Sequence, residues 1–157
     1  MKSNLSNMED KLVNKNLNIL IVDDDIEWLE GYKIILEFCN YEYTTENNPN
    51  RALGLYKNTF NTDKYKFDAV ITDMRMPLMS GIELLKQIKK LDKTARVIII
   101  TAFFNSETEK AINYYEPYAF FGKPVKLSDL ILILNKIELE KKGVEKVQNK
   151  ISLKNEQ

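Results

Sequence analysis

The pattern of hydrophobic and polar positions changes its period repeatedly from Leu17 onward. Short continuous apolar runs are typical of strands covered on both faces, and they occur at 17–22, 67–73 and 96–100, with weaker runs at 41–45 and 118–121. Between them, apolar residues recur at helical spacing, which predicts helices over 26–38, 51–57, 80–90, 106–114 and from about 128 to 142. The chain therefore alternates strand and helix.

This alternation predicts right-handed strand–helix–strand units and a parallel sheet. Five strands with five helices fit an α/β, flavodoxin-like, doubly wound five-stranded parallel sheet of order 2-1-3-4-5. Such a fold hosts many functions, so the function has to be argued from the residues of the site.

The two ends of the chain differ from its centre. Residues 1–16 are polar and mixed in charge, which favours a frayed leader, and residues 142–157 form a polar tail around a domain over 17–141. Ile137, Val144 and Ile151 recur at sevens, as in a coiled coil, but Gly143 and the flanking charges favour a solvated, fraying helix.

Composition narrows the function classes. The chain has 157 residues, 44% of them hydrophobic, and a formal net charge of zero, so nothing in its overall charge indicates nucleic acid or an acidic membrane as a partner. Cys39 is the single cysteine, which excludes an internal disulfide and favours a cytoplasmic location. The absence of histidine excludes His-based triads and His metal sites. No apolar run is long enough to span a bilayer.

Chemically active residues follow four of the predicted strands. The first strand ends in Asp23-Asp24-Asp25, the third in Asp73, the fourth in Thr101-Ala102 and the fifth in Lys123-Pro124. Taken singly, each has an ordinary explanation, because Asp often starts a turn or caps a helix and Lys-Pro often forms a turn. These four strands would lie side by side, so their carboxyl ends would bring acids, a hydroxyl and an ammonium to one edge of the sheet.

This combination suits phosphoryl capture. Carboxylates that share a cleft repel one another unless a cation neutralises them, and Mg²⁺ is the cation that takes few carboxylates together with phosphate oxygens and water. Two acids from the first strand would hold the ion and leave Asp73 as an oxygen nucleophile. Mg²⁺, Lys123, Thr101 and the backbone N–H of Ala102 could each serve an oxygen of the phosphoryl group.

These residues resemble those of the receiver domain of two-component response regulators. Ile19 to Asp25 is similar to the family's first strand and acid pair, and 73–81, Asp-Met-Arg-Met-Pro-Leu-Met-Ser-Gly, resembles its phosphoacceptor motif. The resemblance implies Asp23 and Asp24 as Mg²⁺-site acids, Asp73 as the phosphorylated residue and the backbone carbonyl of Arg75 as a further metal ligand. Thr101-Ala102 and Lys123-Pro124 match the family's switch threonine pair and phosphate-binding lysine.

The resemblance also implies a mechanism. A sensor histidine kinase or a phosphotransfer protein would donate a phosphoryl group to Asp73, and the protein would be no enzyme beyond its own phosphorylation and slow dephosphorylation. Thr101 would move towards the phosphate, and Phe120 would move into the vacated space. Phe120 lacks the hydroxyl of a tyrosine, so this coupling would be looser; it is equally explained as a plain core residue.

Other aromatic residues indicate a regulatory face. In the family, the face formed by the predicted helix at 106–114, the strand at 118–121 and the last helix carries dimer or target contacts, which implies a possible homodimer. We expect Phe104 and Tyr115 to be exposed there. Bulky Arg75 and Phe103, two residues beyond Asp73 and Thr101, would lie beside the path of attacking water and slow hydrolysis of the phosphoryl group.

Two other functions use the same residues. An Mg²⁺-dependent phosphatase with an Asp nucleophile needs these chemical parts, but such enzymes usually carry nucleophile and acid in one motif after the first strand. A scaffold that has lost phosphorylation would not need the complete set that is present here.

Overall fold

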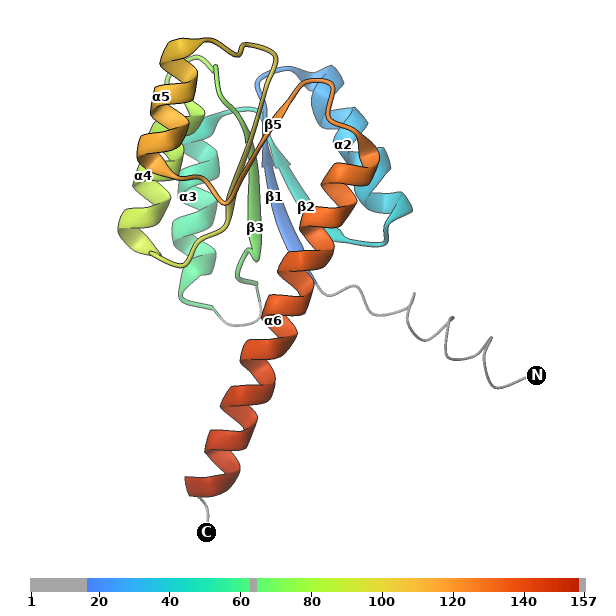
Figure 1. The fold of residues 1–157 in the computed structure, drawn as a ribbon, viewed down its shortest axis with the longest axis vertical. Coiled ribbons are helices and arrows are strands. Elements are labelled where there is room, and N and C mark those ends of the chain that lie inside the picture. Colours follow the sequence, from blue (N-terminus) through green and yellow to red (C-terminus); the bar gives the residue numbers. More distant parts are fainter. Residues whose placement is uncertain (1–16, 63–64, 156–157) are drawn as a thin grey trace, which may run out of the picture. The chain divides into compact units, whose positions relative to one another are not determined.

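The sheet has the predicted strand order. The computed structural model describes residues 17–62 and 65–155, with side chains up to residue 143. Its five parallel strands follow the order β2-β1-β3-β4-β5, and they are β1 (Asn18–Val22), β2 (Glu42–Glu46), β3 (Ala69–Asp73), β4 (Val97–Thr101) and β5 (Ala119–Gly122). The predicted α/β, doubly wound architecture is confirmed (Figure 1).

Five helices connect and follow these strands. They are α2 (Ile26–Phe38), α3 (Pro49–Phe60), α4 (Gly81–Leu91), α5 (Ser106–Tyr115) and α6 (Leu127–Asn155). Side-chain oxygens accept hydrogen bonds from the free backbone N–H groups at the starts of the first four helices, with Asp25, Asn48, Ser80 and Asn105 as caps. Ser80 and Glu83 form a capping box at the start of α4, in which each side chain accepts a hydrogen bond from the other residue's backbone N–H.

One face of the sheet packs on a large apolar core. Alternate residues of the strands, such as Leu20, Val70 and Ile99, contact buried residues of α3 and α4, and residues of α5 pack against the same cluster. Helices α3, α4 and α5 accordingly lie on one side of the sheet, whereas α2 lies on the other (Figure 1). The middle strands β3 and β4 are buried along their whole length, as their continuous apolar runs predict.

The chain divides into two compact units, Met1–Val125 and Lys126–Gln157. The second unit contains α6, which continues to Asn155 and therefore extends beyond the predicted end at about 142. The side chains of Val144 and Ile151, on which the coiled-coil pattern depends, lie outside the described residues, as does the predicted leader 1–16. In the described part of the chain, no helix combines the length and apolar character needed to cross a membrane.

Two predictions about exposed aromatic residues differ in outcome. Phe104 is exposed, as expected, with 62% of its surface accessible. Tyr115 is instead half-buried: its ring packs against the core and makes an edge contact with Tyr114, while Lys86 lies over it at 5.0 Å. Tyr114 takes the exposed position. Because α5 extends to Tyr115, this residue follows Ala111 and Ile112 at helical spacing, and all three pack against the core on the same face of the helix.

Candidate functional site

Asp23, Asp73 and Lys123 meet at the carboxyl edge of the sheet. The ammonium Nζ of Lys123 donates to Asp23 Oδ2 at 2.6 Å and lies 2.9 Å from Asp73 Oδ1. All three side chains are buried, with exposed fractions of 6% for Lys123, 2% for Asp23 and 9% for Asp73. Residues from three separate strand ends thus form one charged cluster, as the strand-end pattern predicts.

The backbone after each strand holds these side chains in place. The N–H of Asp25 donates to Asp23 Oδ1 at 3.0 Å, and the N–H of Arg75 donates to Asp73 Oδ2 at 2.7 Å. Each carboxylate therefore turns back on its own loop with one oxygen and offers the other oxygen to Lys123. On the neighbouring strands, the N–H of Lys123 donates to the carbonyl of Thr101 at 2.8 Å, which fixes the start of the lysine loop beside β4.

Gly81 allows the loop after Asp73 to close tightly. Its N–H donates to the carbonyl of Met74 at 2.9 Å, and a Cβ at this position would lie 2.2 Å from the backbone oxygen of Asp73. Such a contact is far inside van der Waals distance, so only glycine fits here. Within the same loop, Leu78 has a φ of 72°, a left-handed conformation that is uncommon for a branched side chain.

The cluster has an unbalanced charge. Two ionised carboxylates and one ammonium leave one net negative charge among buried groups. Burial raises the pKa of Asp23, and the hydrogen bond from Lys123 only partly counteracts this. Burial alone would lower the pKa of Lys123, but its bonds to Asp23 and Asp73 outweigh burial and raise it. Lys123 is therefore a permanent cation, whereas the acids would gain from a second positive charge.

The other predicted site residues lie around this cluster. Thr101 is buried at the end of β4, and its Oγ1 accepts a hydrogen bond from the N–H of Phe103 at 3.1 Å. Ala102, Asp24 and Arg75 are exposed at the same edge of the sheet. Phe120 is half-buried on β5, where it pairs in register with Ile99 and its ring centroid lies 5.7 Å from that of Phe104.

The residues present fit a magnesium ion. Among the described residues, no group of three or more His, Cys, Asp or Glu side chains is gathered closely enough to ligate a metal. Mg²⁺ does not need such a group, because it usually binds one or two carboxylates and keeps several waters. Asp23 and Asp73 provide two carboxylates that share the Lys123 ammonium, and their excess negative charge favours a cation.

Two aromatic residues of α2 lie at this site although the sequence pattern did not predict them as site residues. The ring of Trp28 lies over the ammonium of Lys123, with 4.7 Å from Nζ to the ring centroid. The hydroxyl of Tyr32, one turn further along, is buried without a hydrogen-bond partner. Burial and the negative charges of Asp23 and Asp73 raise its pKa. The sequence did contain a signal for Trp28, because this residue lies in the first turn of a predicted helix that directly follows Asp23-Asp24-Asp25.

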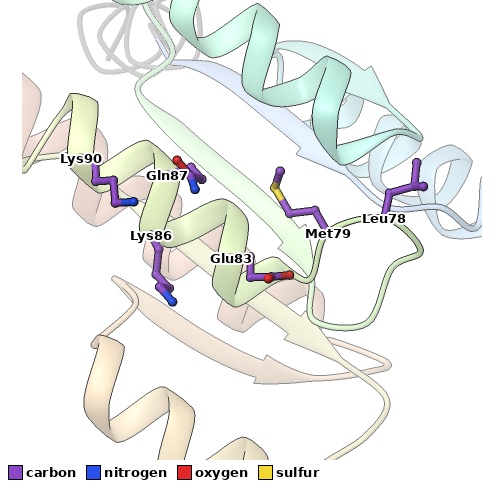
Figure 2. Close-up of a pocket in the computed structure, with 6 residues that line it drawn as sticks. All are labelled: Leu78, Met79, Glu83, Lys86, Gln87 and Lys90. Atoms are coloured by element: carbon purple, nitrogen blue, oxygen red, sulfur yellow. The ribbon is translucent and has the colours of Figure 1, made fainter.

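A separate pocket lies beside the loop after β3. It has a volume of about 190 Å³ and is lined by Leu78, Met79, Glu83, Lys86, Gln87 and Lys90. Figure 2 shows that its polar side chains come from α4 and that Leu78 and Met79 come from the loop. None of the predicted site residues lines it, so the charged cluster and this pocket are distinct features.

Comparison with known proteins identifies the family. The family model described as the response regulator receiver domain matches residues 19–135. The chain belongs to the response regulator receiver domain family. A response regulator receiver protein of Anaeromyxobacter sp. (strain Fw109-5) is 36% identical over 106 residues, which cover 68% of this chain and 42% of that protein. The transcriptional regulatory protein ZraR of Escherichia coli (strain K12) is 30% identical over 80% of this chain and 27% of its own length.

Solved receiver domains share the fold. A response regulator receiver domain protein of Clostridium thermocellum has a TM-score of 0.72 and 30% identity, covering 82% of this chain and 99% of that structure. A CheY from Borrelia burgdorferi, solved in complex with CheX, BeF₃ and Mg²⁺, has a TM-score of 0.70 and 26% identity, covering 81% of this chain and 96% of that one. The receiver domain thus accounts for nearly all of these structures, whereas the chain spans less than half the length of the curated relatives named above.

Proposed function

We propose that this receiver domain accepts a phosphoryl group on Asp73 and thereby switches its binding to a partner. The buried Asp23–Lys123–Asp73 cluster is the observation that carries the proposal, because it pairs a fixed ammonium with two acids in a site of net negative charge. We assign the receiver domain to residues 17–141, with polar segments at 1–16 and 142–157. We also propose a cytoplasmic location, which the single cysteine supports.

In this proposal, Asp73 is the nucleophile. One of its oxygens attacks the phosphorus of a phosphohistidine on a sensor kinase or phosphotransfer protein; a P–O bond forms, the P–N bond breaks, and the released imidazole is protonated by solvent. Water later attacks the phosphorus and breaks the P–O bond, which yields inorganic phosphate and the original carboxylate. The transfer to Asp73 requires no general base, because the carboxylate itself is the nucleophile, whereas the attacking water of the second step gives its protons to solvent and phosphate.

The surrounding groups would stabilise the transferred charge. Lys123, the hydroxyl of Thr101 and the N–H of Ala102 would each serve a phosphoryl oxygen. Asp23, Asp24, Asp73 and the carbonyl of Arg75 would hold Mg²⁺, which supplies charge neutralisation on the phosphoryl oxygens when bound. Thr101 must release the N–H of Phe103 when it turns to the phosphate, which links phosphorylation to the loop before α5.

Phosphorylation would change binding at the surface around α5 and β5. Phe103, Phe104 and Tyr114 are all more than half exposed there, and exposed aromatic residues are typical of interfaces. Phe120 lies between this surface and the core, where it would respond to a movement of Thr101. We propose that this face binds a target or a second copy of the chain; participation of the last helix stays a prediction, and we propose no direct binding to nucleic acid or membrane.

Intact mass after incubation with acetyl phosphate and Mg²⁺ tests the phosphoacceptor. The expected result is a single base-labile phosphoryl adduct on the wild type and none on Asp73→Ala. Asp92→Asn is the matched control, because Asp92 is also a buried acid near a lysine but lies away from this site. An adduct that persists on Asp73→Ala contradicts the assignment, and its absence from folded wild type, even with a histidine kinase as donor, favours the scaffold.

A further inference from the structure

The indole ring of Trp28 covers the ammonium that joins the two acids. Its ring centroid lies 4.7 Å from Lys123 Nζ, within the range of a cation–π contact. Trp28 is half-buried, and its ring also contacts that of Tyr32 at 6.3 Å between centroids. Helix α2 begins directly after Asp23 and Asp24, with Asp25 as its cap. The helix therefore places the Trp28 ring against the charged cluster.

Burial of the apolar face of an amphipathic helix does not by itself explain why these aromatic residues lie at the cluster. The neighbouring Tyr32 is 3% exposed, yet its hydroxyl has no hydrogen-bond partner, which is unusual for a buried phenol. Trp28 does not belong to the apolar cluster formed on the other face of the sheet. Its described polar contact is the lysine ammonium, which also touches both acids.

We propose that Trp28 is a positioning residue of the phosphoacceptor site, because the face of its indole ring holds the Lys123 ammonium in place while the phosphoryl group arrives on Asp73. The inference rests on the function proposed above. A hydrogen bond fixes a lysine in one direction, whereas attraction to a ring face varies little with small shifts of the cation. The ring can therefore keep Lys123 near the site when its partner changes from a carboxylate oxygen to a phosphoryl oxygen.

The rate of phosphorylation by acetyl phosphate tests this role. Trp28→Leu keeps apolar bulk but removes the ring face, and we expect a rate about three- to thirtyfold lower, the range that a buried cation–π contact supplies. Trp28→Phe retains a ring face and should recover part of the loss. Phe38→Leu is the matched control on the same helix, because Phe38 is 82% exposed; its rate should equal that of the wild type.

Trp28 is also the only tryptophan of the chain, so its fluorescence reports on the same contact. Beryllofluoride with Mg²⁺, a stand-in for the phosphoryl group, should change the emission of the wild type but not of Asp73→Ala. The measurement needs no substitution of Trp28 itself, which keeps the test decisive if Trp28→Leu folds poorly.

The outcomes separate this inference from the proposed function. If the folded wild type forms no adduct even with a histidine kinase as donor, the phosphoacceptor assignment fails. If the wild type forms the adduct, but Trp28→Leu is folded by circular dichroism and matches Phe38→Leu in rate, the positioning role is wrong. An emission spectrum that is unchanged when beryllofluoride binds overturns it as well.

Discussion

Two buried acids near a lysine lie at opposite edges of the sheet and behave differently. At the amino edge, Asp92 accepts hydrogen bonds from the Tyr56 hydroxyl at 3.1 Å and from the N–H and hydroxyl of Thr94 at 2.9 and 2.6 Å, and it pairs with Lys66 at 3.2 Å. Burial would raise the pKa of Asp92, but the hydrogen bonds from Thr94 and the charge of Lys66 outweigh burial and lower the pKa. At the carboxyl edge, burial dominates and the pKa of Asp23 is raised.

The difference separates an acid that stabilises the fold, Asp92, from an acid of the proposed site, Asp23. Asp92 has enough donors for its charge, so it stabilises the fold by linking α3, the end of α4 and the segment before β3. Asp23 shares one ammonium with a second acid and lies near a hydroxyl without a partner. Burial of a carboxylate alone is therefore no sign of function, whereas burial without sufficient compensation indicates a site prepared for a further cation or ligand.

Gly81→Ala should have the largest effect on the carboxyl edge. The new methyl group would contact the backbone oxygen of Asp73, and the loop has to move to relieve the clash. We expect the free energy of unfolding to fall by about 3 kcal/mol, at the upper end of the range for overpacking. Urea unfolding measures the change. Gly31→Ala is the control, because a Cβ there has nothing within 4 Å and should be neutral or stabilising; equal losses in both variants would contradict the steric argument.

Asp92→Asn should lower the free energy of unfolding by about 2 kcal/mol at neutral pH, since charged hydrogen bonds are lost in a buried position. The pKa of Asp92 is lower in the folded than in the unfolded state, so its contribution is present above the unfolded pKa and lost as the pH falls through the folded one. The stability difference between wild type and variant should therefore shrink on acidification from neutral pH. A constant difference would show that the charge of Asp92 is unimportant.

Asp23→Asn should instead raise the free energy of unfolding. Removing one of two competing carboxylates leaves Lys123 paired with Asp73 and relieves the cost of a buried charge, so we expect a gain of about 1 kcal/mol in Mg²⁺-free buffer at neutral pH. Thermal unfolding beside Asp92→Asn makes the comparison direct. If both substitutions destabilise the protein equally, the two edges do not differ in the way described.

Arg75→Asn combined with Phe103→Glu should give the smallest effect. The guanidinium of Arg75 lies over the Phe103 ring, 4.6 Å from its centroid, and this pair bridges the loops that follow Asp73 and Thr101. Opening it should speed loss of the phosphoryl group about two- to fivefold, as expected for an exposed cation–π contact. The decay of the adduct after removal of acetyl phosphate provides the lifetime; an unchanged lifetime would remove the hypothesis of a shielded phosphoryl group.

The sequence predicts the carboxyl edge well for a physical reason. Parallel strands must end at the same edge, so residues that directly follow them, such as Asp23, Asp73 and Lys123, meet whatever the details of packing. Asp92, Tyr56 and Lys66 escape this reasoning because they come from helix interiors and connections, where no periodic rule brings distant side chains together. Their network emerges only from the packed structure.

Side-chain direction also limits what the sequence can predict. The apolar spacing of α2 includes Ile26 in the buried face, but Ile26 is 62% exposed because it is the first residue of the helix, while Trp28 lies over the site. Tyr115 was misplaced by the end of a helix in the same way. Helix periodicity predicts which face is apolar, but it is least informative in the terminal turns.

The spacing of the charged cluster along the chain has a consequence for synthesis. Lys123 contacts an acid 100 residues earlier in the sequence, and Asp73 lies midway between them. A growing polypeptide emerges from its N-terminus, so both acids are available long before the lysine that joins them. The cluster assembles only after the fifth strand has been made and has docked. A chain synthesised only as far as β4 would therefore lack the cluster, and the phosphorylation proposed above would require that all five strands have been made.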